Sequence, residues 1–230
     1  MYRPVQQWKR YAWRAGRMLQ GEPEETTPLD KLDAAGRERF WERGHEQVAR
    51  LAEQIDTHAG FTLENKRVLD FGCGVGRNSL ALAERCEHVY GLDVSPKVLS
   101  QADEAAKRLN LSNVEWMEAD RLAELSGNYD LVISLFVFQH IPTREGERTF
   151  ATILQGLRPG GAGAIQVTLR PPRFRGPERA YFYMLRTSYS LNRLGRLLAD
   201  AGITEWHVKL FPRPSHDDVT IIFRKDDVSG

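Results

Sequence analysis

A strand pattern that runs into three alternating glycines constrains this chain more than any other feature. The apolar stretch 68–71 is followed by glycine at positions 72, 74 and 76. Glycine lets the backbone turn sharply and lets a ligand approach without interference from a Cβ atom. A second apolar stretch, 89–92, ends in Asp93, and an acid at this place can accept hydrogen bonds from both hydroxyls of a ribose. The two segments together predict a nucleoside pocket in an α/β fold.

The glycine spacing separates two kinds of nucleoside site. A dinucleotide fingerprint, G-x-G-x-x-G, requires a third glycine at position 77, where this chain has Arg77. Asp70 lies at the strand end, where a carboxylate is unfavourable unless it is paired, so we expect a cationic partner for it. Asp120, after a third strand, adds a further acid at the same edge. This pattern disfavours a nicotinamide enzyme.

Composition excludes several classes of protein. Lys and Arg number 32 against 31 Asp and Glu, which argues against a protein that coats nucleic acid or lies on a membrane. No apolar run is long enough to span a bilayer, and residues 1–20 lack the apolar core of a secretory signal. Cys73 and Cys86 are spaced neither as a metal knuckle nor as a disulfide framework. We therefore expect a cytoplasmic protein.

The chain divides into an extension and one large domain. Residues 1–35 predict a short basic, Trp-containing amphipathic helix and a loop, which either packs on the domain or contacts a partner. Residues 36–230 predict the domain itself. It starts with a helix at 40–55, and strands then alternate with helices whose buried faces include Leu109.

The order of elements predicts the fold class. Strands are expected at 68–71, 89–93, 114–117, 131–138 and 164–169, with a turn at 158–161. The last two stretches, 206–211 and 219–223, are joined by too few residues for a crossover helix and should pair antiparallel. The prediction is a doubly wound, seven-stranded, mostly parallel sheet that ends in a C-terminal antiparallel β-hairpin.

From about residue 40 to residue 225 the chain resembles the class I S-adenosylmethionine-dependent methyltransferases. The match includes the glycine turn, the strand-end acid Asp93, the acid Asp120, the fourth strand, the Arg-Pro-Gly-Gly turn at 158–161 and the terminal hairpin. This resemblance implies S-adenosyl-L-methionine as cofactor, with Asp93 at the ribose and Asp120 at the adenine. The residues expected to contact the cofactor are Asp70, Gly72, Cys73, Gly74, Gly76, Asp93, Val94, Asp120, Arg121 and Ser134.

The expected reaction is in-line methyl transfer to a small molecule, more readily to oxygen than to nitrogen. His140 follows the fourth strand and is expected to act as a general base or, alternatively, to hydrogen-bond a neighbouring loop. No acidic cluster stands near that strand end, so a metal-independent reaction is expected. The alternatives are a catalytically silent S-adenosylmethionine-binding interaction protein and an enzyme that methylates a protein or a glycan.

The acceptor is expected to bind near residues 170–189. This segment is rich in Arg and in aromatic residues, which suits an anionic, sugar-like or aromatic acceptor, although a solvated loop would have the same composition. The motifs typical of enzymes that methylate nucleic-acid bases are absent after the fourth strand, so no nucleic-acid partner is expected. The sequence does not indicate an oligomeric state.

Overall fold

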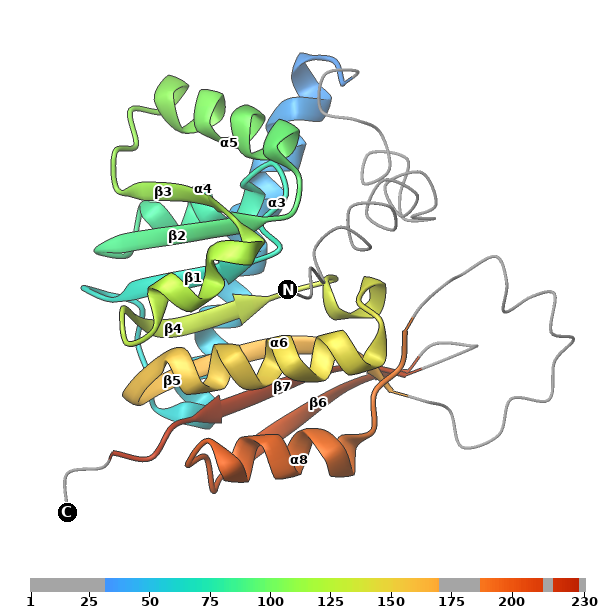
Figure 1. Cartoon of the computed structure of the whole chain (residues 1–230). Coiled ribbons are helices and arrows are strands. Elements are labelled where there is room, and N and C mark those ends of the chain that lie inside the picture. Colours follow the sequence, from blue (N-terminus) through green and yellow to red (C-terminus); the bar gives the residue numbers. More distant parts are fainter. Residues whose placement is uncertain (1–31, 170–186, 213–216, 228–230) are drawn as a thin grey trace, which may run out of the picture.

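The computed structural model describes residues 32–169, 187–212 and 217–227 and contains a single seven-stranded sheet. The strand order is β3-β2-β1-β4-β5-β7-β6 (Figure 1). In chain order the strands are β1 (Arg67–Phe71), β2 (His88–Asp93), β3 (Val114–Glu118), β4 (Tyr129–Ser134), β5 (Leu157–Leu169), β6 (Trp206–Pro212) and β7 (Asp217–Arg224).

The pairing of the strands confirms the predicted fold class. The first five strands pair in parallel, whereas β7 is antiparallel to both β5 and β6. Parallel strands place their carboxyl ends at one edge of the sheet, and in open α/β sheets this edge carries the ligand crevice. The elements that follow β1, β2, β3 and β4 therefore meet along one edge.

Helices cover both faces of the sheet. Helices α6 (Thr143–Gly156) and α8 (Leu191–Asp200) pack on one face in a core that includes Phe150, Leu194 and Phe71. Helices α3 (Ala34–Ala59) and α4 (Arg77–Ala83) pack on the other face (Figure 1). The core on this face includes Ile55 and Leu131. Because both faces are covered, the central strands are apolar on both sides.

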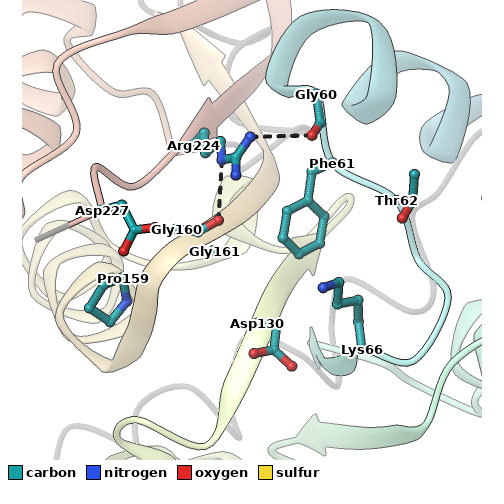
Figure 2. Close-up of a pocket in the computed structure, with 10 residues that line it drawn as sticks. All are labelled: Gly60, Phe61, Thr62, Lys66, Asp130, Pro159, Gly160, Gly161, Arg224 and Asp227. Atoms are coloured by element: carbon teal, nitrogen blue, oxygen red, sulfur yellow. Dashed lines mark hydrogen bonds between the residues drawn. The ribbon is translucent and has the colours of Figure 1, made fainter. Parts of the chain in front are cut away.

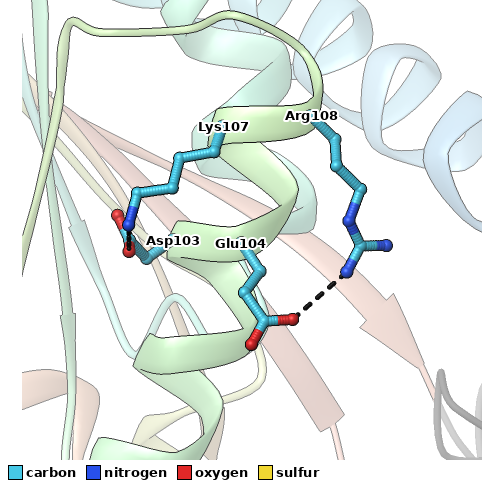
Figure 3. Close-up of polar contacts among 4 residues, drawn as sticks. All are labelled: Asp103, Glu104, Lys107 and Arg108. Carbon is cyan, nitrogen blue, oxygen red and sulfur yellow. Dashed lines mark hydrogen bonds and ion pairs between the residues drawn. The ribbon is translucent and has the colours of Figure 1, made fainter.

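Helix α5 (Pro96–Arg108) lies beside α4 over β2 and β3. Its apolar face is buried, and its exposed face carries the pairs Asp103–Lys107 and Glu104–Arg108, with N–O distances of 2.6 and 3.2 Å (Figure 3). Each pair has four-residue spacing with the acid first, the arrangement that stabilises a helix surface. These pairs are exposed, so salt screens them and the buried face does most to hold α5 in place.

Helix α3 is longer than the predicted helix at 40–55. The Asp33 side chain caps its first turn by accepting the N–H of Gly36 at 2.7 Å, and Gly60 ends it in a left-handed conformation. The predicted boundary between residues 35 and 36 falls in the first turn of this helix. Most of the predicted extension, residues 1–31, lies outside the described residues.

Several predicted boundaries were wrong. Strand β4 ends at Ser134 instead of continuing to residue 138, because the backbone at Phe136 takes a φ of 61°. Residues 158–161 belong to β5 instead of a separate turn, and β7 begins at Asp217 instead of 219. Leu109 is 50% exposed because it lies at the C-cap of α5, past the last buried turn.

Candidate functional site

The glycine turn between β1 and α4 is fixed against the end of β2. The backbone N–H groups of Gly72 and Cys73 donate to the carbonyl of Leu92 at 2.7 and 2.9 Å. Gly72 has a φ of 81°, and a Cβ built on it would lie 2.2 Å from Val137. A side chain here would be strained and would also collide with a neighbour, so both the conformation and the packing require glycine.

Gly76 and Gly74 differ in what surrounds them. Gly76 has a φ of 83°, and a Cβ there would meet the Trp116 ring at 2.7 Å, so packing also excludes a side chain. Gly74 has a φ of 57°, and a Cβ there would meet no atom within 4 Å. The middle of the turn therefore borders open space, which is the room that a nucleoside ligand needs to approach the backbone.

Asp93 stands beside this open position. Its Oδ2 accepts the N–H of Gly74 at 3.1 Å, and its Oδ1 accepts the N–H of Ser95 at 2.9 Å. Burial raises the pKa of this carboxyl, and hydrogen bonds from backbone N–H groups act in the opposite direction. A carboxylate oxygen can accept more than one hydrogen bond, so Asp93 keeps capacity for the two hydroxyls of a ribose.

Asp70 lies beneath the turn with only 3% of its surface exposed. The hydroxyl of Ser79, in α4, donates to its Oδ2 at 2.6 Å, so the hydrogen bond to this carboxylate comes from a neutral group. Burial raises the pKa of Asp70 to about 6, against the opposing effects of the Ser79 hydrogen bond and the Arg77 charge. Asp70 is thus a poorly solvated acid that a nearby cationic ligand would hold in its ionised form.

The other predicted cofactor residues near the turn are already packed. The Ser134 hydroxyl donates to the carbonyl of Phe71 at 2.9 Å, and Val94 is buried after β2. The Cys73 thiol has its pKa raised well above 9.0 by burial and by the charges of Asp70 and Asp93. The thiolate form of Cys73 is therefore disfavoured.

Asp120 and Arg121 follow β3 in the short helix η2 (Ala119–Leu125), and both are exposed. Strand β3 pairs with β2, so η2 begins beside the end that carries Asp93. The Arg121 guanidinium binds the Glu124 carboxylate through Nε and Nη2, at distances down to 2.7 Å. A side-chain contact from Arg121 to a cofactor would have to replace this bidentate pair.

His140 ends the short helix η3 (Phe138–His140), which follows β4 at the same edge of the sheet. Its Nε2 lies 3.1 Å from Nε2 of the buried Gln139. An amide nitrogen donates, so this contact makes His140 Nε2 the acceptor and places the proton of the neutral ring on Nδ1.

The ends of the predicted acceptor segment lie at the same edge. Residues 170–186 are outside the described part of the chain, but Leu169 forms a parallel bridge with Tyr189. The N–H of Tyr189 donates to the carbonyl of Thr168 at 2.8 Å, and its buried hydroxyl lies 2.9 and 2.8 Å from the carbonyls of Phe138 and Ile141. Tyr189 is thus a core residue that ties β5 to η3.

A cavity of about 340 Å³ lies at the opposite edge of the sheet, at the amino ends of β1, β4 and β5 (Figure 2). Arg224 crosses it and donates to the carbonyls of Gly60 and Gly160, each at 3.3 Å. Asp130, also in its wall, accepts from Arg158 and from the N–H of Arg67. These side chains hold the fold together, and the cavity is remote from the glycine turn.

Several residues that shape the site carry no sequence signal of their own. Val137 fills the space beside Gly72, Trp116 lies against Gly76, and the Gln166 side chain accepts the N–H of Phe136 at 3.1 Å. Ser79, which binds Asp70, does carry a sequence signal, because it is a polar residue within an apolar helix face. In the described ranges, no group of three or more His, Cys, Asp or Glu side chains is arranged to hold a metal ion. Nor does any helix in them combine the length and apolarity needed to cross a membrane.

The chain is similar to known methyltransferases. A family model described as a methyltransferase domain matches residues 68–161. The ubiquinone biosynthesis O-methyltransferase of Aromatoleum aromaticum is 31% identical over 77% of this chain and 66% of its own length. Phosphoethanolamine N-methyltransferase 1 of Arabidopsis thaliana is 30% identical over 70% of this chain and 32% of its own length. The chain therefore spans less than two thirds of either relative.

Solved structures support the same assignment at the level of the fold. The magnesium protoporphyrin IX methyltransferase of Synechocystis, crystallised with bound SAM, matches with a TM-score of 0.64 and 21% identity. The match covers 98% of this chain and 99% of that one. The matched domain, the relatives and the shared fold together show that the chain belongs to the class I S-adenosylmethionine-dependent methyltransferases.

Proposed function

We propose that this protein binds S-adenosylmethionine at the carboxyl edge of β1 and β2 and methylates a small molecule there. The observation that carries the proposal is the pairing of Asp93 with Gly74. The acid accepts the N–H of a glycine whose missing side chain leaves open space. A ribose fits such a site because a carboxylate can accept from both of its hydroxyls while the sugar lies against bare backbone.

The remaining residues are proposed to contact the adenine and the ammonium group of the cofactor. Val94 and Leu122 are buried after β2 and β3 and offer apolar surface to the adenine, and Asp120 supplies an acceptor for its amino group. Asp70 and the carbonyls of Gly72 and Ser134 suit the ammonium group. When bound, S-adenosylmethionine supplies an electrophilic methyl group for in-line transfer.

His140 is proposed to take the proton of an acceptor hydroxyl. Its position after β4 is near the glycine turn, because Val137, three residues earlier, packs on Gly72. An imidazole titrates near neutral pH and can accept a proton from a hydroxyl. This base favours transfer to oxygen over nitrogen, because an amine needs only to arrive neutral. The curated relatives include both O- and N-methyltransferases.

Residues 170–189 are proposed to complete the acceptor pocket. The bridge between Leu169 and Tyr189 brings both ends of this segment to the carboxyl end of β5, on the edge that carries the cofactor residues. The Arg-rich and aromatic composition of the segment suits an acceptor with anionic or aromatic groups.

A thermal-shift panel tests the cofactor assignment. S-adenosylmethionine or S-adenosylhomocysteine at about a hundred times its Kd should stabilise the protein by about 2.7 kcal/mol, whereas NAD should not. Asp93→Ala should abolish the shift, and Asp103→Ala, on the exposed face of α5, should retain it. A full shift in Asp93→Ala would disprove the ribose assignment. Transfer of labelled methyl groups to metabolite extracts would then separate an enzyme from a silent binding protein.

A further inference from the structure

Phe136 has a backbone conformation that its side chain does not favour. Its φ is 61°, and the other non-glycine residues with positive φ in the described ranges are Asn65 and Asn110. Asparagine tolerates this left-handed region because its short polar side chain can bond locally, whereas a bulky aromatic residue does not. The surroundings must therefore hold Phe136 in place.

Contacts from three directions hold this bend. The N–H of Phe136 donates to Oε1 of Gln166 at 3.1 Å, and Gln166 is only 8% exposed on the neighbouring strand β5. On one side, the Ser134 hydroxyl is bonded to Phe71, and on the other, Val137 packs on Gly72. The bend is thus tied to the same turn that borders the proposed cofactor site.

The ring of Phe136 is not held there for packing, because 43% of the residue remains exposed. The other large apolar residues exposed to this degree in the described ranges are Leu109, at the end of α5, and Val208 and Leu210, on the edge strand β6. Of these four, Phe136 alone adjoins the glycine turn. Strained residues held by over-determined surroundings are concentrated at ligand-binding sites.

We propose that Phe136 is a stacking surface for the methyl acceptor, that this acceptor carries a planar aromatic ring, and that Gln166 positions Phe136. An exposed aromatic ring gains most from another planar group, through offset or edge-to-face contacts and through the apolar area that both rings bury. His140 follows four residues later, at the end of η3 on the same edge of the sheet. The inference rests on the proposed function and narrows its substrate class.

Calorimetry on the protein saturated with S-adenosylhomocysteine tests this inference without turnover. The planar probes are protocatechuate, quercetin and protoporphyrin, and the non-aromatic probes are phosphoethanolamine and trans-aconitate. At least one planar probe should bind, and Phe136→Ala should lower the affinity for that probe about tenfold or more. The affinity for S-adenosylhomocysteine should stay within about twofold of the wild type.

Matched variants separate stacking from unfolding and test the role of Gln166. Phe136→Gly should also lose affinity for the planar probe. It should nevertheless melt at a higher temperature than Phe136→Ala, because glycine accepts the positive φ. Gln166→Leu removes the acceptor of the Phe136 N–H and should weaken binding of the planar probe. Gln166→Glu keeps an accepting oxygen and should restore part of the affinity. Leu109→Ala removes a similarly exposed apolar side chain outside the site and should leave the affinity for the planar probe unchanged.

The outcomes distinguish this inference from the proposed function. If the wild type binds no S-adenosylhomocysteine, the proposed function fails. If it binds that molecule but no planar probe, or if Phe136→Ala binds the planar probe as well as the wild type does, the stacking assignment is overturned and the proposed function stands. Wild-type affinity for the probe in Gln166→Leu would overturn the positioning role.

Discussion

The Ser79 hydroxyl donates a 2.6 Å hydrogen bond to the carboxylate of Asp70, and both side chains are buried. The bond joins the end of β1 to α4 across the glycine turn, so the acid is fixed before any ligand arrives. Burial still dominates, and the pKa of Asp70 rises from 3.8 to about 6. The site therefore contains an acid that titrates just below neutral pH.

Asp70 should make stability depend on pH. Between about 3.8 and about 6 the folded protein binds more protons at this group than the unfolded chain does, so the free energy of unfolding should fall as pH rises through that window. Above it, the buried charge costs on the order of 3 kcal/mol. Asp70→Asn should weaken this dependence, leaving the part that comes from the raised pKa of Asp93, and Asp103→Asn should not, as urea unfolding at several pH values would show. An unchanged pH profile in Asp70→Asn would contradict the raised pKa.

Cofactor binding should release protons at Asp70. An ammonium group placed near this acid favours its ionised form, so affinity for S-adenosylmethionine should rise as pH increases from about 5 to about 7. Titration calorimetry in buffers with different ionisation enthalpies measures the protons released below the pKa of about 6. Asp70→Asn should release fewer protons. Equal proton release by both proteins would place the ammonium group elsewhere.

Gly74→Ala should separate binding from folding. Its Cβ would meet no atom within 4 Å, so the fold should lose only the cost of a left-handed alanine, about 1–2 kcal/mol. The matched control is Gly202→Ala, because Gly202 has a φ of 76° and equally open surroundings outside the site. Both variants should melt about 2–8 °C lower, but only Gly74→Ala should lose affinity for S-adenosylhomocysteine. Equal affinity in the two variants would show that the cofactor does not bind against Gly74.

Tyr189→Phe should lower turnover through His140. The Tyr189 hydroxyl lies within 2.9 Å of the carbonyl of Phe138, so its loss should loosen η3 and cost about 1–3 kcal/mol of stability. Tyr129→Phe, which removes a buried 2.6 Å hydrogen bond to Ile153, is the control for stability alone. Turnover is expected to fall further in Tyr189→Phe than in Tyr129→Phe, in assays well below both melting temperatures. Equal loss in both would show that the effect is only structural.

His140→Ala should lower turnover while leaving cofactor affinity intact. If His140 is the base, its loss should reduce kcat about 10²- to 10⁴-fold. Binding of S-adenosylhomocysteine provides the control measurement on the same protein. A wild-type rate in His140→Ala would show that His140 is not the base.

The order of the elements and the acids at the strand ends could be predicted from the residues alone. Apolar periodicity is local, so it fixed β1, β2 and the closing hairpin, and the glycine spacing fixed the turn that Asp93 borders. It could not show that β4 stops at Ser134, because an apolar run carries no sign of a bend held from a distance. The polar Ser79 stands out in an apolar helix face, but its pairing with Asp70 depends on how α4 packs against the end of β1.

The bend at Phe136 depends on groups far apart in the chain, and the pairing of Ser79 with Asp70 depends on the packing of α4, so both form only in the folded protein. Gln166 lies thirty residues from the Phe136 N–H that it holds, and Val137 is far in sequence from the Gly72 that it covers. Such contacts form once the sheet brings neighbouring strand ends together, and they leave no periodic trace in the sequence. The local sequence pattern therefore predicts the kind of site, whereas the hydrogen bonds within the site depend on long-range packing.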